Sequence, residues 1–148
     1  MLYGTEATGK SAIATALLEK LASGGPEDND DAPALKYAVV NSVECVTSRH
    51  LFESVVAKAT AALQWDHPPI RCETVSQLTV ELSKMLKYTV RPDGFRFVLV
   101  FDGIDRQREA PPTLLPALAR LSEIVRLSLS LSLFPPPLEI YLLPLFIS

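Results

Sequence analysis

The chain has 148 residues, about the length of one compact domain, and this length excludes a large multidomain machine. Hydrophobic residues make up 48% of the chain and charged residues 21%, a balance that excludes a disordered tail because it allows a buried core. The formal net charge of −3 provides no positive field for a polyanion, so we do not expect this chain to bind nucleic acid directly.

The first predicted feature along the chain is a phosphate-binding loop. It follows the Walker A pattern G-x-x-x-x-G-K-[ST] and consists of Gly4, Thr5, Glu6, Ala7, Thr8, Gly9, Lys10 and Ser11. The glycines let the backbone turn its N–H groups toward a phosphate, Lys10 reaches the β and γ oxygens, and Ser11 supplies a hydroxyl ligand for Mg²⁺. The pattern predicts that these residues bind ATP and Mg²⁺. A glycine turn that only caps a helix is the alternative.

Residues 9–22 have helical spacing, and this helix would direct its positive end at the same anion. Ile13, Leu17 and Leu21 recur at intervals of four, which predicts that they form the apolar stripe of an amphipathic helix. Residues 26–33 then hold four acidic side chains and no apolar side chain larger than alanine, which predicts a solvated loop.

Strands and helices alternate over the central part of the chain. The predicted elements are a strand at 37–40, a helix at 48–64, a capping box at 74–77 that starts a third helix, a strand buried on both faces at 96–101, and a helix at 114–125. Pro116 is compatible with the last helix only in its first turn. Helices between strands imply parallel pairing through crossovers. The predicted fold class is α/β, with a three-layer αβα core around a mainly parallel sheet.

Asp102 closes the apolar strand at 96–101 and is the second candidate site residue. At the carboxyl edge of a parallel sheet, beside the phosphate loop, this carboxylate would orient the hydration shell of Mg²⁺ in the Walker B role. Hydrolysing proteins of this class usually carry a glutamate at the next position, where this chain has Gly103, and Asp105 is not expected to replace it. We therefore predict nucleotide binding with little or no hydrolysis and assign no catalytic residue.

Other notable side chains receive structural interpretations. Cys45 and Cys72 lack the spacing of a zinc site or a disulfide framework and are interpreted as packed thiols in a reducing compartment. His50 and His67 lie far apart with no second ligand at metal spacing. Trp65 is expected to anchor a loop to the core.

A partner-facing role stays open for a few charged residues. Glu44 and Arg49 follow the predicted strand at 37–40. They fit either a solvated helix entry, which we favour, or a contact with a partner. Arg106, Arg108 and Arg120 could include a residue that reaches a neighbour's nucleotide, although arginine is common on helix surfaces.

Residues 126–148 differ in composition from the rest of the chain. A Leu/Ser alternation there fits a half-buried strand, but the prolines at 135–137 would end it. These prolines and Glu139 also interrupt the run of about 20 apolar residues that a membrane span needs. We interpret residues 126–148 as a tail that is not native to the fold, as in a truncated or mis-spliced product. A hydrophobic end that packs on the core is the alternative.

Four segments carry a resemblance to a known family: residues 2–11, 40–49, 101–102 and 114–121. They resemble the subunit 5 family of the eukaryotic origin recognition complex, whose members are AAA+ initiators. The resemblance extends from residue 2 to about residue 124. The phosphate loop is generic, and the stretch Asn41-Ser42-Val43-Glu44-Cys45 is the more particular signature.

This resemblance implies a partial AAA+ nucleotide-binding domain over residues 1–125, truncated at both ends. The family continues with a sensor strand, a helical lid and a winged-helix domain, and residues 126–148 stand where the sensor strand would begin. The ATP-contacting positions of the family correspond to Gly9, Lys10, Ser11 and Asp102. Family members bind ATP without appreciable hydrolysis, in agreement with the glycine at 103.

The resemblance also implies a nuclear location and a role in the initiation of DNA replication. ATP would be held at an interface with other origin recognition complex subunits, DNA would be reached only through the assembled complex, and no membrane would be involved. Two alternatives remain: an active P-loop enzyme, either a hydrolysing AAA+ ATPase or a small kinase, and a remnant that binds no nucleotide.

Overall fold

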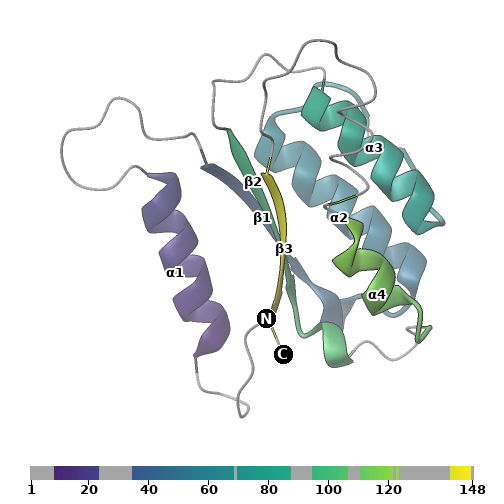
Figure 1. The fold of residues 1–148 in the computed structure, drawn as a ribbon, viewed down its shortest axis with the longest axis horizontal. Coiled ribbons are helices and arrows are strands. Elements are labelled where there is room, and N and C mark those ends of the chain that lie inside the picture. The colour runs from purple at the N-terminus through teal and green to yellow at the C-terminus, as the bar shows by residue number, and fades with distance from the viewer. Residues whose placement is uncertain are drawn as a thin grey trace.

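The structure is a computed structural model that describes residues 9–23, 35–68, 70–87, 95–106, 111–121, 123 and 141–147. Its elements form three layers (Figure 1). The helix α1 (Lys10–Ala22) lies on one face of a sheet, and the other face carries α2 (Ser48–Leu63), α3 (Val75–Lys87) and α4 (Leu114–Ala119). This arrangement confirms the predicted α/β class with a three-layer αβα core.

The sheet contains β1 (Leu35–Asn41), β2 (Arg96–Asp102) and β3 (Tyr141–Ile147), which run parallel in the order β1-β2-β3. The register pairs Asn41 with Asp102, so two polar residues stand level at the carboxyl edge of the sheet. A short 3₁₀ turn follows each of the first two strands there, η1 (Ser42–Glu44) after β1 and η2 (Ile104–Arg106) after β2. The two turns contact each other.

The central strand β2 is buried on both faces, as its continuous apolar run predicts. Because side chains alternate along a strand, its residues divide between the two faces. Phe97, Leu99 and Phe101 belong to the larger hydrophobic cluster, while Val98 and Val100 belong to the smaller one.

The larger cluster lies under α2 and α3. The four positions that the helical spacing at 48–64 predicts as apolar, Leu51, Val55, Ala59 and Leu63, are all buried in it. Trp65 packs against the same cluster, which confirms its predicted role as a loop anchor. Cys45 and Cys72 are free, buried thiols of this cluster, as predicted.

Side chains cap the starts of α2 and α3. Thr47 Oγ1 accepts a hydrogen bond from the backbone N–H of His50 at 3.2 Å and begins α2. Thr74 Oγ1 accepts from the N–H of Gln77 at 3.2 Å, and Gln77 Oε1 accepts from the N–H of Glu73 at 2.7 Å. The predicted capping box is thus confirmed. The side chain of Gln77 accepts from the backbone N–H of Glu73, one residue before the N-cap Thr74, instead of from Thr74 itself.

The predicted apolar stripe of α1 is wrong. Ile13, Leu17 and Leu21 are 68%, 56% and 56% exposed, whereas Ala14 and Leu18 are buried. The helix carries two neighbouring rows of apolar residues, and within each row the residues recur at intervals of four. This spacing alone does not determine which row packs on the sheet. The row of Ala14 and Leu18 packs on the face of β2 that the larger cluster does not use.

The last elements differ from the predictions in extent. Pro116 lies in the first turn of α4, as predicted. The helix α4 ends at Ala119 and a turn follows at Arg120, but residues 121 and 123 are helical again, so the predicted helix at 114–125 is interrupted at Arg120. Tyr141–Ile147 of the predicted tail pairs with β2 as β3, and Pro144 is compatible with this strand because β3 lies at the end of the described sheet. Residues 124–140 and the acidic segment at 26–33 lie outside the described residues. The domain boundary at 125 stays a prediction.

None of the helices in the described ranges combines the length and the hydrophobicity that a membrane crossing requires.

Candidate functional site

Two of the predicted site residues meet at the carboxyl edge of the sheet. Ser11 lies in the first turn of α1, and Asp102 is the last residue of β2. Ser11 Oγ donates a hydrogen bond to Asp102 Oδ1 at 2.9 Å, although the two residues are 91 positions apart in the sequence. Both side chains are half-buried. This contact joins the end of the predicted phosphate loop to the acid that closes the buried strand.

The beginning of α1 has the backbone expected after a phosphate loop. Gly9 is the N-cap residue and adopts a left-handed conformation with φ of 75°. A Cβ at Gly9 would meet no atom of the described residues within 4 Å, so in this part of the structure the backbone angles, and not crowding, favour glycine. Lys10 follows as the first, half-buried residue of the helix. The other loop positions, Gly4, Thr5, Glu6, Ala7 and Thr8, lie outside the described residues.

The donor set fits a magnesium ion in chemistry and spacing. Mg²⁺ prefers oxygen ligands at about 2.1 Å in octahedral geometry, which places neighbouring ligand atoms about 3 Å apart. The 2.9 Å between Ser11 Oγ and Asp102 Oδ1 is an ordinary hydrogen-bond length, and it is also compatible with this separation. A hydroxyl and a carboxylate held this way can serve one Mg²⁺ together with phosphate oxygens.

Gly103 directly follows Asp102 and also has a left-handed backbone, with φ of 65°. A Cβ added at this glycine would lie 2.5 Å from Val43 Cγ2, inside any allowed contact distance. A side chain at this position, where hydrolysing proteins of this class usually carry a glutamate, is therefore disfavoured by the backbone conformation, and Val43 would have to move to accommodate it. Asp105, two residues further on, is exposed in η2.

The turn that provides Val43 is held by its own hydrogen bonds. Asn41 Oδ1 accepts from the N–H of Val43 at 3.2 Å, and Asn41 Nδ2 donates to Glu44 Oε1 at 2.8 Å. Cys45 Sγ donates to the carbonyl oxygen of Asn41 at 3.5 Å. Burial raises the pKa of the Cys45 thiol. A hydrogen bond with the side chain of Ser54 lowers this pKa, and the negative charge of Glu44 raises it. The thiol therefore keeps the proton that it donates.

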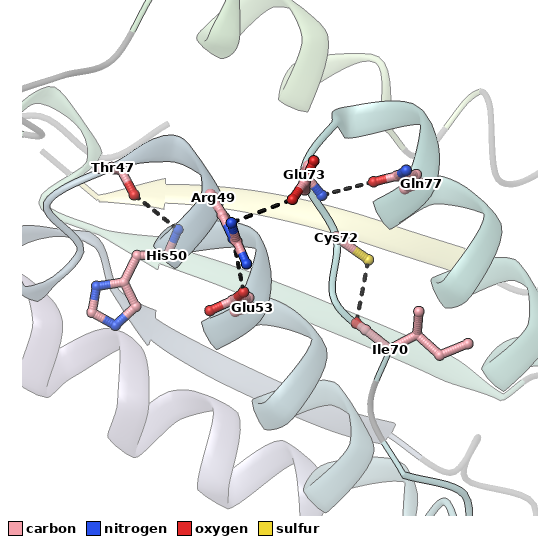
Figure 2. Close-up of polar contacts among 8 residues, drawn as sticks. All are labelled: Thr47, Arg49, His50, Glu53, Ile70, Cys72, Glu73 and Gln77. Atoms are coloured by element: carbon pink, nitrogen blue, oxygen red, sulfur yellow. Dashed lines mark hydrogen bonds and ion pairs between the residues drawn. The ribbon is translucent and has the colours of Figure 1, made fainter.

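Arg49 pairs with two carboxylates of its own domain (Figure 2). Its Nε lies 3.1 Å from Glu53 Oε1 on the same helix, and its Nη1 lies 3.3 Å from Glu73 Oε1 in the segment before α3. Glu44 accepts from Asn41, as described above. These contacts favour the interpretation of Glu44 and Arg49 as charges of a helix entry over the partner-facing alternative.

A hollow of about 280 Å³ lies beside this ion pair at the start of α3. Ile70, Cys72 and Gln77, seen in Figure 2, help to line it. Burial raises the pKa of the Cys72 thiol, and Glu81 and Glu53 raise it further while Lys84 lowers it. Among the predicted nucleotide-binding residues that the structure describes, none lines this hollow.

The remaining candidates include three arginines and two histidines. Arg106 and Arg120 are exposed, and Arg108 lies outside the described residues. His67 forms an edge-to-face contact with the Trp65 ring at 5.0 Å between centroids. Over the described ranges, no three His, Cys, Asp or Glu side chains gather in a way that could hold a metal ion.

The three-layer fold, with Ser11 and Asp102 in contact at the carboxyl edge of its sheet, is that of the AAA+ class. The chain matches the AAA ATPase domain family over residues 1–132 and belongs to that family.

Its similarity extends to proteins of DNA replication. It is 27% identical over 128 residues to origin recognition complex subunit 5 of Drosophila melanogaster, a match that covers 86% of this chain and 25% of that protein. Its structure is similar to that of the Aeropyrum pernix ORC1 protein in complex with DNA, with a TM-score of 0.60 and 19% sequence identity. That match covers 99% of this chain and 32% of the ORC1 chain. The chain thus spans about a quarter to a third of these relatives. The predicted resemblance to origin recognition complex proteins is confirmed.

Sequence reasoning missed the contact between Val43 and Gly103. Motif spacing identified both segments, but a contact between residues 60 positions apart follows only from the register of β1 and β2. The glycine itself was a signal, because a residue that needs a positive φ often stands in a tight turn.

Proposed function

We propose that this chain is an ATP-binding AAA+ domain that acts within an origin recognition complex in the initiation of DNA replication. In this proposal ATP and Mg²⁺ are a ligand that strengthens association with other subunits, more than a substrate that is hydrolysed. Lys10 and the loop from Gly4 to Gly9 would hold phosphate groups, and Ser11 and Asp102 would hold Mg²⁺. The bound ion would neutralise phosphate charge. DNA would be reached through the assembled complex, in the nucleus.

The contact of 2.9 Å between Ser11 Oγ and Asp102 Oδ1 carries this proposal. It brings together the two oxygen ligands that a P-loop domain uses for Mg²⁺, from segments that are distant in the sequence. The similarity to origin recognition complex subunit 5 supports the choice of complex. The net charge of −3 supports contact with DNA through partners and not through this chain alone.

Titration calorimetry with ATP and Mg²⁺ tests the binding site. We expect Lys10→Ala and Asp102→Ala each to weaken binding by about 10-fold or more, because each removes a charged contact to phosphate or metal. Two matched controls should stay within about twofold: Lys20→Ala, in the last turn of the same helix, and Asp105→Ala, in the turn after β2. No binding by the unsubstituted chain would identify it as a remnant.

Two further measurements test the role of the nucleotide. Copurification with the other origin recognition complex subunits should increase when ATP and Mg²⁺ are present, because a ligand that prefers the assembled state stabilises it. Steady-state ATP hydrolysis should be slow or absent. A rate on the order of one per second that disappears in Asp102→Ala would instead identify an active AAA+ ATPase.

A further inference from the structure

The turn formed by Asn41 to Cys45 lies next to the proposed nucleotide site, which assigns it no role. Asn41 stands next to Asp102 in the sheet register. Both polar atoms of its side chain are engaged within the turn, by Val43 and by Glu44. Asn41 therefore shapes this turn, and the turn presents Val43 to the end of β2.

Val43 packs where Gly103 has no side chain. Its Cγ2 lies 2.5 Å from the position that a Cβ of Gly103 would take, so the valine methyl fills that space. Gly103 is the first residue after Asp102 and has a φ of 65°, so its backbone makes the bend that follows the carboxylate. Ile104, the next residue, is buried in the larger cluster and fixes the other side of this bend.

We propose that the Asn41–Cys45 turn is a positioning element, in which Val43 braces the backbone of Gly103 and so keeps Asp102 directed at Ser11. This inference rests on the proposed function, in which Asp102 holds Mg²⁺. It has a direct consequence for chemistry at the site. Any side chain at position 103, including a water-activating glutamate, would overlap with the present position of Val43. It would also place a residue other than glycine in an unfavourable left-handed backbone conformation.

A thermal unfolding experiment on the full chain tests the packing contact without nucleotide. Gly103→Ala should lower Tm by roughly 5–10 °C, from backbone strain and from overlap with Val43. In a Val43→Ala background the overlap is absent, so Gly103→Ala should lower Tm by only about half as much.

Two controls separate the causes of this loss. Gly9→Ala places a Cβ at another positive φ where nothing lies within 4 Å, and so it measures backbone strain alone. Val46→Ala removes a valine that is 58% exposed, close to the 54% of Val43, from the same segment. In the Val46→Ala background, Gly103→Ala should lower Tm as much as it does in the unsubstituted chain.

Nucleotide titration with and without Mg²⁺ tests the positioning role. Val43→Ala should weaken binding of ATP by about 3- to 10-fold when Mg²⁺ is present and leave binding in EDTA within about twofold. Val43→Thr keeps the branched shape and should bind like the unsubstituted chain, as should Val46→Ala. A loss of structure alone would weaken binding equally under both conditions.

Three results would overturn the inference, and they are distinguishable. An equal effect of Gly103→Ala on Tm in the Val43 and Val43→Ala backgrounds would show that the packing contact does not exist. A Val43→Ala variant that binds ATP normally, or is weakened equally with and without Mg²⁺, would refute the positioning role and leave ATP binding intact. An unsubstituted chain that binds no ATP would refute the proposed function and the positioning role together, while the Tm comparison would still report on the contact.

Discussion

The two faces of the sheet are covered to different degrees. On the face under α2 and α3, a continuous cluster of buried residues extends from the sheet through both helices, with Phe97, Leu82 and Leu51 among its fully buried members. On the face under α1, the buried cluster of the described residues consists of Ala14, Leu18, Val98 and Val100. The outer row of α1, formed by Ile13, Leu17 and Leu21, is exposed.

This difference suggests a division of roles: the face under α2 and α3 contributes most to stability, and the face under α1 carries residues of the proposed site. Buried apolar area is the main favourable contribution to folding, so most of the stability should come from the face under α2 and α3. The helix α1 carries Lys10 and Ser11, and among the described residues it packs on the smaller buried cluster. We therefore expect substitutions on the two faces to differ in cost, even where the residue type is the same.

The largest expected difference is between two leucines on opposite faces. Leu82→Ala should lower the free energy of unfolding by about 3–5 kcal/mol, because Leu82 is fully buried in the larger cluster and its removal leaves a cavity. Leu18→Ala should cost only about 2 kcal/mol, because the smaller cluster around it leaves less of a cavity. Urea denaturation of both variants measures the two values.

Leu17→Ala is the matched control for this pair. Leu17 precedes Leu18 on the same helix and is 56% exposed, so its truncation should change the free energy of unfolding by less than about 0.5 kcal/mol. Equal costs for Leu82→Ala and Leu18→Ala would show that the two faces contribute alike. A large cost for Leu17→Ala would show that the outer row of α1 is buried in solution.

The elements with a strong local signal were predicted from the sequence. The run that forms β2 is apolar at every inner position, and this pattern has no other good explanation than a strand covered on both faces. The capping residues Thr74 and Gln77 indicate the start of α3 to within a residue. The Walker A pattern placed Ser11 close to Asp102, and the structure has these side chains in contact. Their roles in nucleotide binding stay a prediction.

The features that sequence reasoning missed depend on contacts between distant segments. In α1 the wrong apolar row was chosen, because two rows had the same spacing and only the sheet decides between them. The interruption of helical structure at Arg120, after α4, follows no glycine or proline stop signal. The pairing of Tyr141–Ile147 with β2 was not predicted either, because the strand considered in residues 126–148 was the Leu/Ser alternation that the prolines at 135–137 would end.

A smaller effect is expected at the helix starts, where the two faces also differ. Gly9 begins α1 and has no side chain to cap it, whereas Thr47 caps α2 through the N–H of His50. Thr47→Ala should lower the free energy of unfolding by about 1 kcal/mol, because this N–H loses its partner. Thr113→Ala is the matched control, since Thr113 is the N-cap residue of α4 but makes no capping bond. A cost at Thr113 equal to that at Thr47 would show that the hydrogen bond is not the cause.

The smallest effect is expected from the ion pair that joins α2 to the segment before α3. Arg49 is half exposed, as are its partners Glu53 and Glu73, so water and salt screen their attraction. Arg49→Gln should therefore cost less than about 1 kcal/mol at low ionic strength, and the cost should fall toward zero in about 1 M salt. Urea denaturation at both salt concentrations measures this, with Arg71→Gln as an exposed arginine control. A cost that approaches that of Leu82→Ala would mean that charge, and not apolar burial, holds this face together.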